Sequence, residues 1–109
     1  MRNIPSLKNT SQFTEVYENG TSYANKFLVL YVHQTDGEHK VGISASKKIG
    51  NSVVRHRAVR LIRESYRTFK DRIPEGCQLV IVARAKIAQA SQAEVTGALH
   101  HLLKLQKLV

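Results

Sequence analysis

The feature that most constrains the fold is a short, fully apolar run in the second half of the chain. Leu79 to Ala83 reads LVIVA, and the turn signal Pro74-Glu75-Gly76 precedes it. A continuous, β-branched-rich run of this length is typical of a strand that is buried on both faces. We therefore expect residues 78–84 to form a strand in the middle of a sheet.

Two further strands are predicted upstream. Residues 22–33 alternate along their length and predict one long strand. Asp36-Gly37 follows as a strong hairpin signal, and residues 40–46 predict a second strand. One face of the long strand is expected to carry Phe27, Val29, Tyr31 and His33, and the other Lys26, Leu28, Leu30 and Val32.

Three helices are expected around these strands. The first covers residues 9–20 and would end at Gly20 in a left-handed conformation. The second begins at a cap, Asn51 or Ser52, and runs to about Lys70. Ser91-Gln92-Ala93-Glu94 is a capping box that opens the third. The apolar face of this last helix would be Val95, Ala98, Leu99, Leu102, Leu103 and Leu105.

The order of these elements is helix, strand, strand, helix, strand, helix. It predicts one α/β (α+β) domain over residues 1–109, a two-layer sandwich in which helices pack on a small sheet.

The charge of the chain is strongly positive and unevenly placed. Seventeen Lys and Arg residues stand against eight Asp and Glu, a formal net charge of +9. Residues 47–72 hold nine basic and two acidic residues, so this segment carries +7 and the rest of the chain only +2. Such an excess indicates a polyanionic partner, either nucleic acid or an anionic membrane.

The helix predicted at residues 51–70 divides into two faces at 100° per residue. Glu64 is the only acid among its cations, so i, i+4 pairing leaves most of the arginines unneutralised. The apolar side carries Val54, Ala58, Leu61, Ile62 and Phe69. The basic side carries Arg57, Arg60, Arg63, Arg67 and Lys70, with Arg55 at its edge.

This basic face favours nucleic acid over the two competing interpretations. Arginine grips phosphate with a planar fork and stacks on bases. A membrane-surface helix would need its apolar residues free to insert, whereas this domain needs them as core. A merely solvated basic face is the third interpretation. Next to the helix, Lys47, Lys48 and Gly50 lie beside a helix N-terminus at Asn51, which is a natural phosphate site.

Catalytic patterns are missing from the sequence. No zinc-ligand spacing occurs, and Glu64, Asp71 and Asp36 are too scattered to predict a two-metal nuclease site. His100 and His101 are adjacent on a helix and diverge by 100°, which argues against shared ligation. The single cysteine, Cys77, precedes the apolar run and predicts a buried thiol.

The location predicted from the sequence is the cytoplasm. One cysteine permits no internal disulfide, the first five residues lack the apolar core of a signal peptide, and no apolar run is long enough to span a bilayer.

Residues 41–64, VGISASKKIGNSVVRHRAVRLIRE, resemble the signature segment of the bacterial ribonuclease P protein family. The match is long and ungapped, and it continues through Phe13 and Val16-Tyr17 on one side and Val80 to Arg84 on the other. Three residues depart from the pattern: His56 stands at a usual Asn, Val59 at a common Lys, and Ala45 at a Val.

The resemblance implies a fold and a mechanism. The fold would share a rare left-handed β-α-β crossover with ribonuclease P protein and a ribosomal-protein domain. The partners would be a catalytic RNA subunit, which holds Mg²⁺ and hydrolyses precursor tRNA, and the 5′ leader of that precursor. The protein would be monomeric when free and would not be catalytic by itself. A leader cleft is expected at Phe13, Tyr17, Phe27, Tyr31 and Lys48, where the aromatic rings could stack on unpaired bases. RNA-subunit contacts are expected at Lys47, Lys48, Asn51, Arg55, His56, Arg57, Arg60, Arg63 and Arg67.

Two other functions remain open on the sequence. A ribosomal or other structural RNA-binding protein would also fit the basic helix. A stand-alone nuclease would cut precursor tRNA with Mg²⁺ and no RNA subunit.

Overall fold

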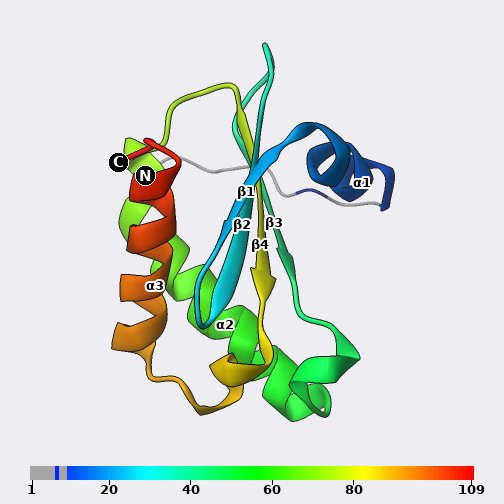
Figure 1. Cartoon of the computed structure of the whole chain (residues 1–109), viewed down its shortest axis with the longest axis vertical. Helices are drawn as coiled ribbons and strands as arrows, with labels where there is room; N and C mark the ends of the chain where they lie inside the picture. The colour runs from blue at the N-terminus through cyan, green and yellow to red at the C-terminus, as the bar shows by residue number, and fades with distance from the viewer. Residues whose placement is uncertain (1–6, 8–9) are drawn as a thin grey trace.

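The computed structural model describes Leu7 and residues 10–109. Helices α2 and α3 cover one face of a four-stranded sheet, and α1 lies against the other face (Figure 1). The α-helices and strands, in chain order, are α1 (Thr10–Asn19), β1 (Thr21–Ala24), β2 (Leu28–Gln34), β3 (Lys40–Ser44), α2 (Ser52–Phe69), β4 (Cys77–Ala83) and α3 (Gln92–Leu105). Short 3₁₀ helices η1 (Lys47–Ile49), η2 (Lys70–Arg72) and η3 (Ala85–Gln89) lie between them.

The apolar strand occupies the centre of the sheet, as predicted. The strand order is β1-β2-β4-β3, in which β4 runs antiparallel to β2 and parallel to β3. Strand β3, helix α2 and strand β4 therefore form the expected parallel β-α-β unit. Neighbours on both edges and packing on both faces leave Leu79, Val80 and Ile81 fully buried.

Two predictions about the other strands were wrong. The long strand expected at residues 22–33 is a hairpin of β1 and β2, broken where the Asn25 Oδ1 accepts the N–H groups of Phe27 and Leu28. The Asp36-Gly37 turn does not join paired strands, because β4 lies between β2 and β3. Strand β4 is buried on both faces and at both edges only in the interior of the sheet. It therefore lies between β2 and β3, although these two strands are consecutive in the chain.

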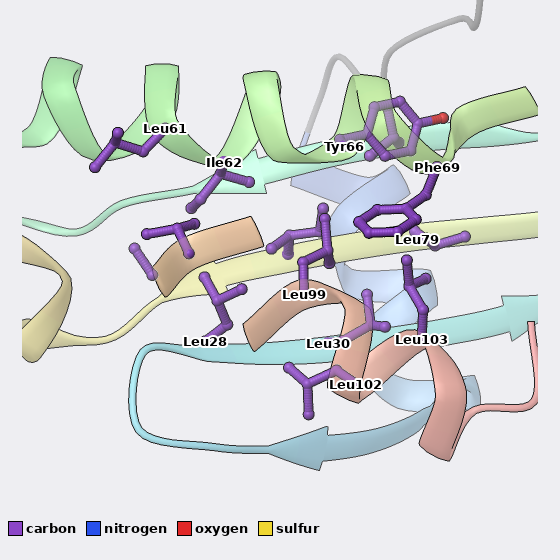
Figure 2. Packing of buried hydrophobic residues seen from close by; sticks show 14 of the residues in the cluster. Leu28, Leu30, Leu61, Ile62, Tyr66, Phe69, Leu79, Leu99, Leu102 and Leu103 are labelled. Carbon is purple, nitrogen blue, oxygen red and sulfur yellow. The ribbon is translucent and has the colours of Figure 1, made fainter. Parts of the chain in front are cut away.

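The main core lies between the sheet and helices α2 and α3 (Figure 2). Leu28 and Leu30 project from β2 toward this layer, and Leu61 and Ile62 meet them from α2. The predicted apolar face of α3 is buried at Val95, Leu99, Leu102 and Leu103, with Ala98 half-buried. Leu105 departs from the prediction, since it keeps 41% of its surface exposed at the helix end.

A smaller cluster holds α1 against the opposite face, referred to below as the outer face of the sheet. Leu7, Val16 and Val80 are its buried members. Gly20 follows α1, but it does not take the predicted left-handed conformation. Glycine is needed here because the backbone of residue 20 lies very close to that of α1 and β2. A Cβ at this position would lie 2.6 Å from the Val16 carbonyl oxygen and 2.8 Å from that of Val32.

Buried polar groups sit at the end of the sheet where β4 begins. The His39 Nδ1 lies 2.6 Å from the carbonyl oxygen of Cys77, and its Nε2 is hydrogen-bonded to the Tyr66 hydroxyl. Cys77 is buried as predicted, and this burial raises the pKa of its thiol. Over Leu7 and residues 10–109, no helix combines the length and apolarity needed to cross a membrane.

Candidate nucleic-acid interface

Helix α2 presents a basic face to solvent. The Asn51 Oδ1 accepts the N–H of Val54 at 3.1 Å and so caps the helix as expected. Ala58, Leu61 and Ile62 are buried on the sheet side, which turns Arg60 and Arg63 outward. Within the described part of the chain, neither of these arginines makes an ion pair or a side-chain hydrogen bond. Their guanidinium groups are therefore available to phosphates.

The remaining basic residues of the helix are not equivalent to these two. Arg57 is half-buried and donates to the carbonyl oxygens of Ala88 at 3.4 Å and Ala90 at 2.7 Å, so it braces η3 against α2. Arg67 pairs with Glu64 at 3.0 Å. His56 is exposed beside them, whereas Arg55 is half-buried and its Nε is a buried nitrogen without a hydrogen-bond partner among the described residues.

The segment before the helix is a 3₁₀ turn with two exposed lysines. Ser46 caps η1 through its hydroxyl, Ile49 is buried under it, and Lys47 and Lys48 are exposed. Gly50 has a φ of +153°, which disfavours any other residue. The fold thus anchors this segment by Ile49 and leaves its two charges in solvent at the N-terminus of α2.

Three of the four predicted cleft aromatics come together on the outer face. The rings of Tyr17 and Tyr31 meet edge-to-face at 4.8 Å between centroids, and the Phe13 ring lies 6.4 Å from that of Tyr17. Gly42 makes room for Phe13, since a Cβ there would lie 2.6 Å from the Phe13 Cζ. Tyr17 is 38% exposed, so its ring can offer surface to a ligand.

Phe27 does not join this group, and its predicted place on the Tyr31 face was wrong. Its ring packs against the main core on the other side of the sheet, with the Lys26 Nζ 5.2 Å from its centroid. Phe27 belongs to the turn between β1 and β2, so the strand alternation that places Tyr31 does not extend to it.

Part of the outer face next to the aromatic rings is only partly covered by other residues. By the register, Tyr31, Val80 and Gly42 form one row across the sheet, and the next row on that face is Val29, Val82 and Ser44. Val29, Val82 and Ser44 keep part of their surface exposed. We name this second row the open strip.

The open strip leads to a basic end that the sequence interpretation missed. Asn25, Lys26, Arg84, Ala85 and Lys86 line a hollow of about 440 Å³ there. The Arg84 Nη1 donates to the Asn25 carbonyl at 2.9 Å. These cations come from two segments that are distant in the chain, with Asn25 and Arg84 separated by 59 positions, so no local charge cluster marked them. The segment that follows β3, which includes η1 with Lys48, lies at this same end of the sheet, and α1 lies at the other end (Figure 1).

No metal centre is apparent in the described part. Across Leu7 and residues 10–109, no three His, Cys, Asp or Glu side chains gather closely enough to hold a metal ion. His100 stacks on Phe69 at 5.1 Å, and the Nδ1 of His101 lies 3.3 Å from the Asn25 Nδ2, so the two histidines diverge as predicted.

Similarity to known proteins extends over nearly the whole chain. Residues 1–107 match the family model described as Ribonuclease P. The ribonuclease P protein component of Lachnoclostridium phytofermentans is 52% identical over 105 residues, which cover 95% of this chain and 90% of that protein. The corresponding component of Alkaliphilus metalliredigens is 38% identical and covers 100% of this chain and 99% of its own.

Solved structures agree with the sequence relatives. The RNase P protein of Staphylococcus aureus superposes with a TM-score of 0.87 at 30% identity, covering 97% of this chain and 98% of that one. The protein from Thermotoga maritima gives 0.80 at 26% identity, covering 94% and 96%. These likenesses give no support to a ribosomal protein, and the handedness of the β3-α2-β4 crossover stays a prediction from the family. The chain belongs to the ribonuclease P protein family, whose members are the protein subunits of an endoribonuclease holoenzyme that processes tRNA.

Proposed function

We propose that this subunit binds RNA with two separate surfaces, one for the catalytic RNA and one for the 5′ leader of precursor tRNA. The aromatic cluster beside the open strip carries the second assignment. Promotion of leader removal then follows from holding both RNAs at once, while the catalytic RNA performs the hydrolysis. A protein with this task works where tRNA is made, which in a bacterium is the cytoplasm.

The catalytic RNA is assigned to the solvent face of α2 together with η1. Arg60 and Arg63 present planar forks that make no ion pair or side-chain hydrogen bond with the described residues, and Lys47 and Lys48 add charge at the helix N-terminus. Phosphate contacts of this kind position an RNA without reading its sequence. His56 lies on the same surface and offers a ring nitrogen where the family usually has an amide. The remaining predicted members of this surface are Asn51, Arg55, Arg57 and Arg67.

The leader is assigned to the outer face of the sheet. An unpaired base can stack on the exposed ring of Tyr17 or on the half-buried ring of Tyr31, and the strand can continue along the open strip to the hollow at Lys26, Arg84 and Lys86. Stacking tolerates any base, which suits a leader whose sequence differs between tRNAs. In this proposal the phosphate oxygens of the RNA hold Mg²⁺. The protein binds and orients the leader.

The test of the leader surface is Tyr31→Ala in the reconstituted holoenzyme. Loss of one stack should weaken binding of leader-bearing precursor by about 5- to 150-fold, the equivalent of roughly 1–3 kcal/mol. Mature tRNA has no leader, so its affinity should stay unchanged. Single-turnover cleavage at saturating enzyme should also be nearly unchanged, because the catalytic groups belong to the RNA.

Two variants serve as controls for this measurement. Tyr31→Phe keeps the ring and should retain precursor affinity. Tyr23→Ala removes a tyrosine that is 42% exposed, pairs with Leu30 and so faces the other side of the sheet, and it should affect neither ligand. Equal losses for precursor and mature tRNA with Tyr31→Ala would show a structural role and remove the leader assignment.

A further inference from the structure

A second hollow lies around the edge of the sheet from the open strip, between strand β3 and helix α2. Its volume is about 400 Å³, which falls within the range of small-molecule sites, roughly 300–1,000 Å³. Its lining includes Phe13 of α1, Ile43 of β3 and Val59 of α2. The apolar part of its lining is therefore contributed by three different elements, and polar groups line the rest.

The sheet side of this hollow also offers backbone hydrogen-bonding groups. Strand β3 pairs with β4 along one edge only, and at its other edge the Val41 carbonyl accepts the N–H of Leu7 at 3.0 Å. In a parallel strand the N–H and C=O of every second residue point to the same side. The donor and acceptor of Ile43 therefore face the edge away from β4, as the Val41 carbonyl does.

Three cations complete the lining. Arg63, Arg67 and Lys70 border the hollow from α2 and η2. Arg63 has no ion pair within the described part of the chain, Glu64 pairs with Arg67, and no Asp or Glu is among the described residues that line the hollow. The rim therefore stays net positive and suits a phosphate beside the apolar walls.

We propose that this hollow binds a single nucleotide, with the base between Phe13 and Val59 and the phosphate at Arg63. Apolar walls receive the faces of a base, the Ile43 peptide groups can pair with its polar edge, and the cations neutralise its phosphate. The proposal deepens the proposed function, because such a nucleotide can be part of the leader or of the catalytic RNA. A free nucleotide has the same chemistry and is the third possible source.

The direct test is a titration of the full-length protein with adenosine 5′-monophosphate, followed by amide chemical shifts in NMR. We expect saturable shifts at residues 41–43 and 59–70 and a dissociation constant on the order of 1 mM, as fits one stacked base with one phosphate. Adenosine should bind the same residues several-fold more weakly. Equal affinity for inorganic phosphate and for adenosine 5′-monophosphate would overturn the proposal, since the base would then add nothing.

A matched pair of variants localises the binding. Val59→Phe fills the hollow and should weaken the binding of adenosine 5′-monophosphate at least tenfold. Val53→Phe makes the same change on the same helix, at a residue that is 74% exposed and lies outside this hollow, and should change the affinity less than twofold. If Val59→Phe perturbs folding, Arg63→Ala provides a second test. It should lower the affinity for adenosine 5′-monophosphate and leave the affinity for adenosine unchanged.

The source of the nucleotide is decided in the holoenzyme with Val59→Phe. Weaker binding of precursor but not of mature tRNA assigns the leader, and weaker assembly with the RNA subunit assigns the catalytic RNA. A defect in neither, with loss of adenosine 5′-monophosphate binding, assigns a free nucleotide. No shift at residues 41–43 and 59–70 at about ten times the expected constant would refute the site. Because this titration uses protein alone, failure of the Tyr31 experiment leaves its result intact.

Discussion

Arg57 and Arg60 lie about one turn apart on α2, yet the fold gives them different tasks. Arg57 donates to two carbonyl oxygens at the end of η3, whereas Arg60 projects into solvent. Periodicity placed both on the basic face, and only the position of η3 distinguishes them. A variant that reverses both charges would therefore combine a folding effect with a binding effect.

Single substitutions should separate these two effects. Arg57→Ala should lower the free energy of unfolding by about 1–3 kcal/mol, because the Ala88 and Ala90 carbonyls lose a charged donor. Arg60→Ala should change stability by less than about 0.5 kcal/mol. Urea denaturation of the free protein measures both values.

The same pair of variants predicts an RNA-binding result. If about five phosphates are neutralised, the logarithm of the affinity for the RNA subunit should fall with the logarithm of salt at a slope of about −4 to −5. Arg60→Ala should reduce the steepness of that slope by roughly one unit. A slope unchanged by Arg60→Ala would show that this arginine contacts no phosphate.

At the scale of elements, helix α1 depends on one close backbone approach. Gly20 N donates to the Val16 carbonyl at 2.8 Å, and the Gly20 Cα lies against the β2 backbone at Val32. Glu15 also reaches His33, at 3.7 Å between the carboxylate and the ring nitrogen. Because Tyr17 sits on this helix, any displacement of α1 also moves a wall of the leader surface.

Gly20→Ala should therefore destabilise the protein and weaken leader binding together. The added Cβ meets two carbonyl oxygens that cannot move independently of the backbone, a clash that should cost about 1–3 kcal/mol. Gly97→Ala is the matched control, since its Cβ meets no atom within 4 Å on α3. That variant should stabilise the helix by about 0.5–1 kcal/mol. Thermal unfolding ranks the two, and a neutral Gly20→Ala would contradict the close-approach argument.

At the scale of the whole molecule, the two proposed RNA surfaces lie on opposite sides of the sheet. Tyr31 belongs to the outer face, and the basic face of α2 lies beyond the main core. The intervening core is packed with fully buried residues such as Leu30, Ile62 and Leu79. The protein can therefore contact the catalytic RNA and the leader at the same time, without competition between them.

This separation predicts additive effects of Tyr31→Ala and Arg60→Ala. Residues without shared partners usually combine within about 0.5 kcal/mol. Holoenzyme affinity for precursor, measured for both single variants and the double variant at one salt concentration, provides the comparison. A coupling energy well above that value would mean that one RNA contacts both surfaces.

The local sequence determined the elements that need no distant partner. The capping groups of Asn51 and Ser91 start α2 and α3 where predicted, because each bonds an N–H three residues away. The apolar run of β4 correctly predicted a central strand, because only a position inside the sheet buries both of its faces. The basic face of α2 and the meeting of Phe13, Tyr17 and Tyr31 followed from periodicity and from the family resemblance.

Tertiary structure decided whatever depends on contacts between distant segments. Insertion of β4 overrode the local hairpin signal at Asp36-Gly37, and the turn made by Asn25 moved Phe27 to the opposite face from Tyr31. The basic end at Lys26 and Arg84 and the hollow beside Ile43 exist only because separate strands meet there. Sequence periodicity specifies which face of its own element a residue occupies, but the neighbour on that face is fixed only when the sheet assembles.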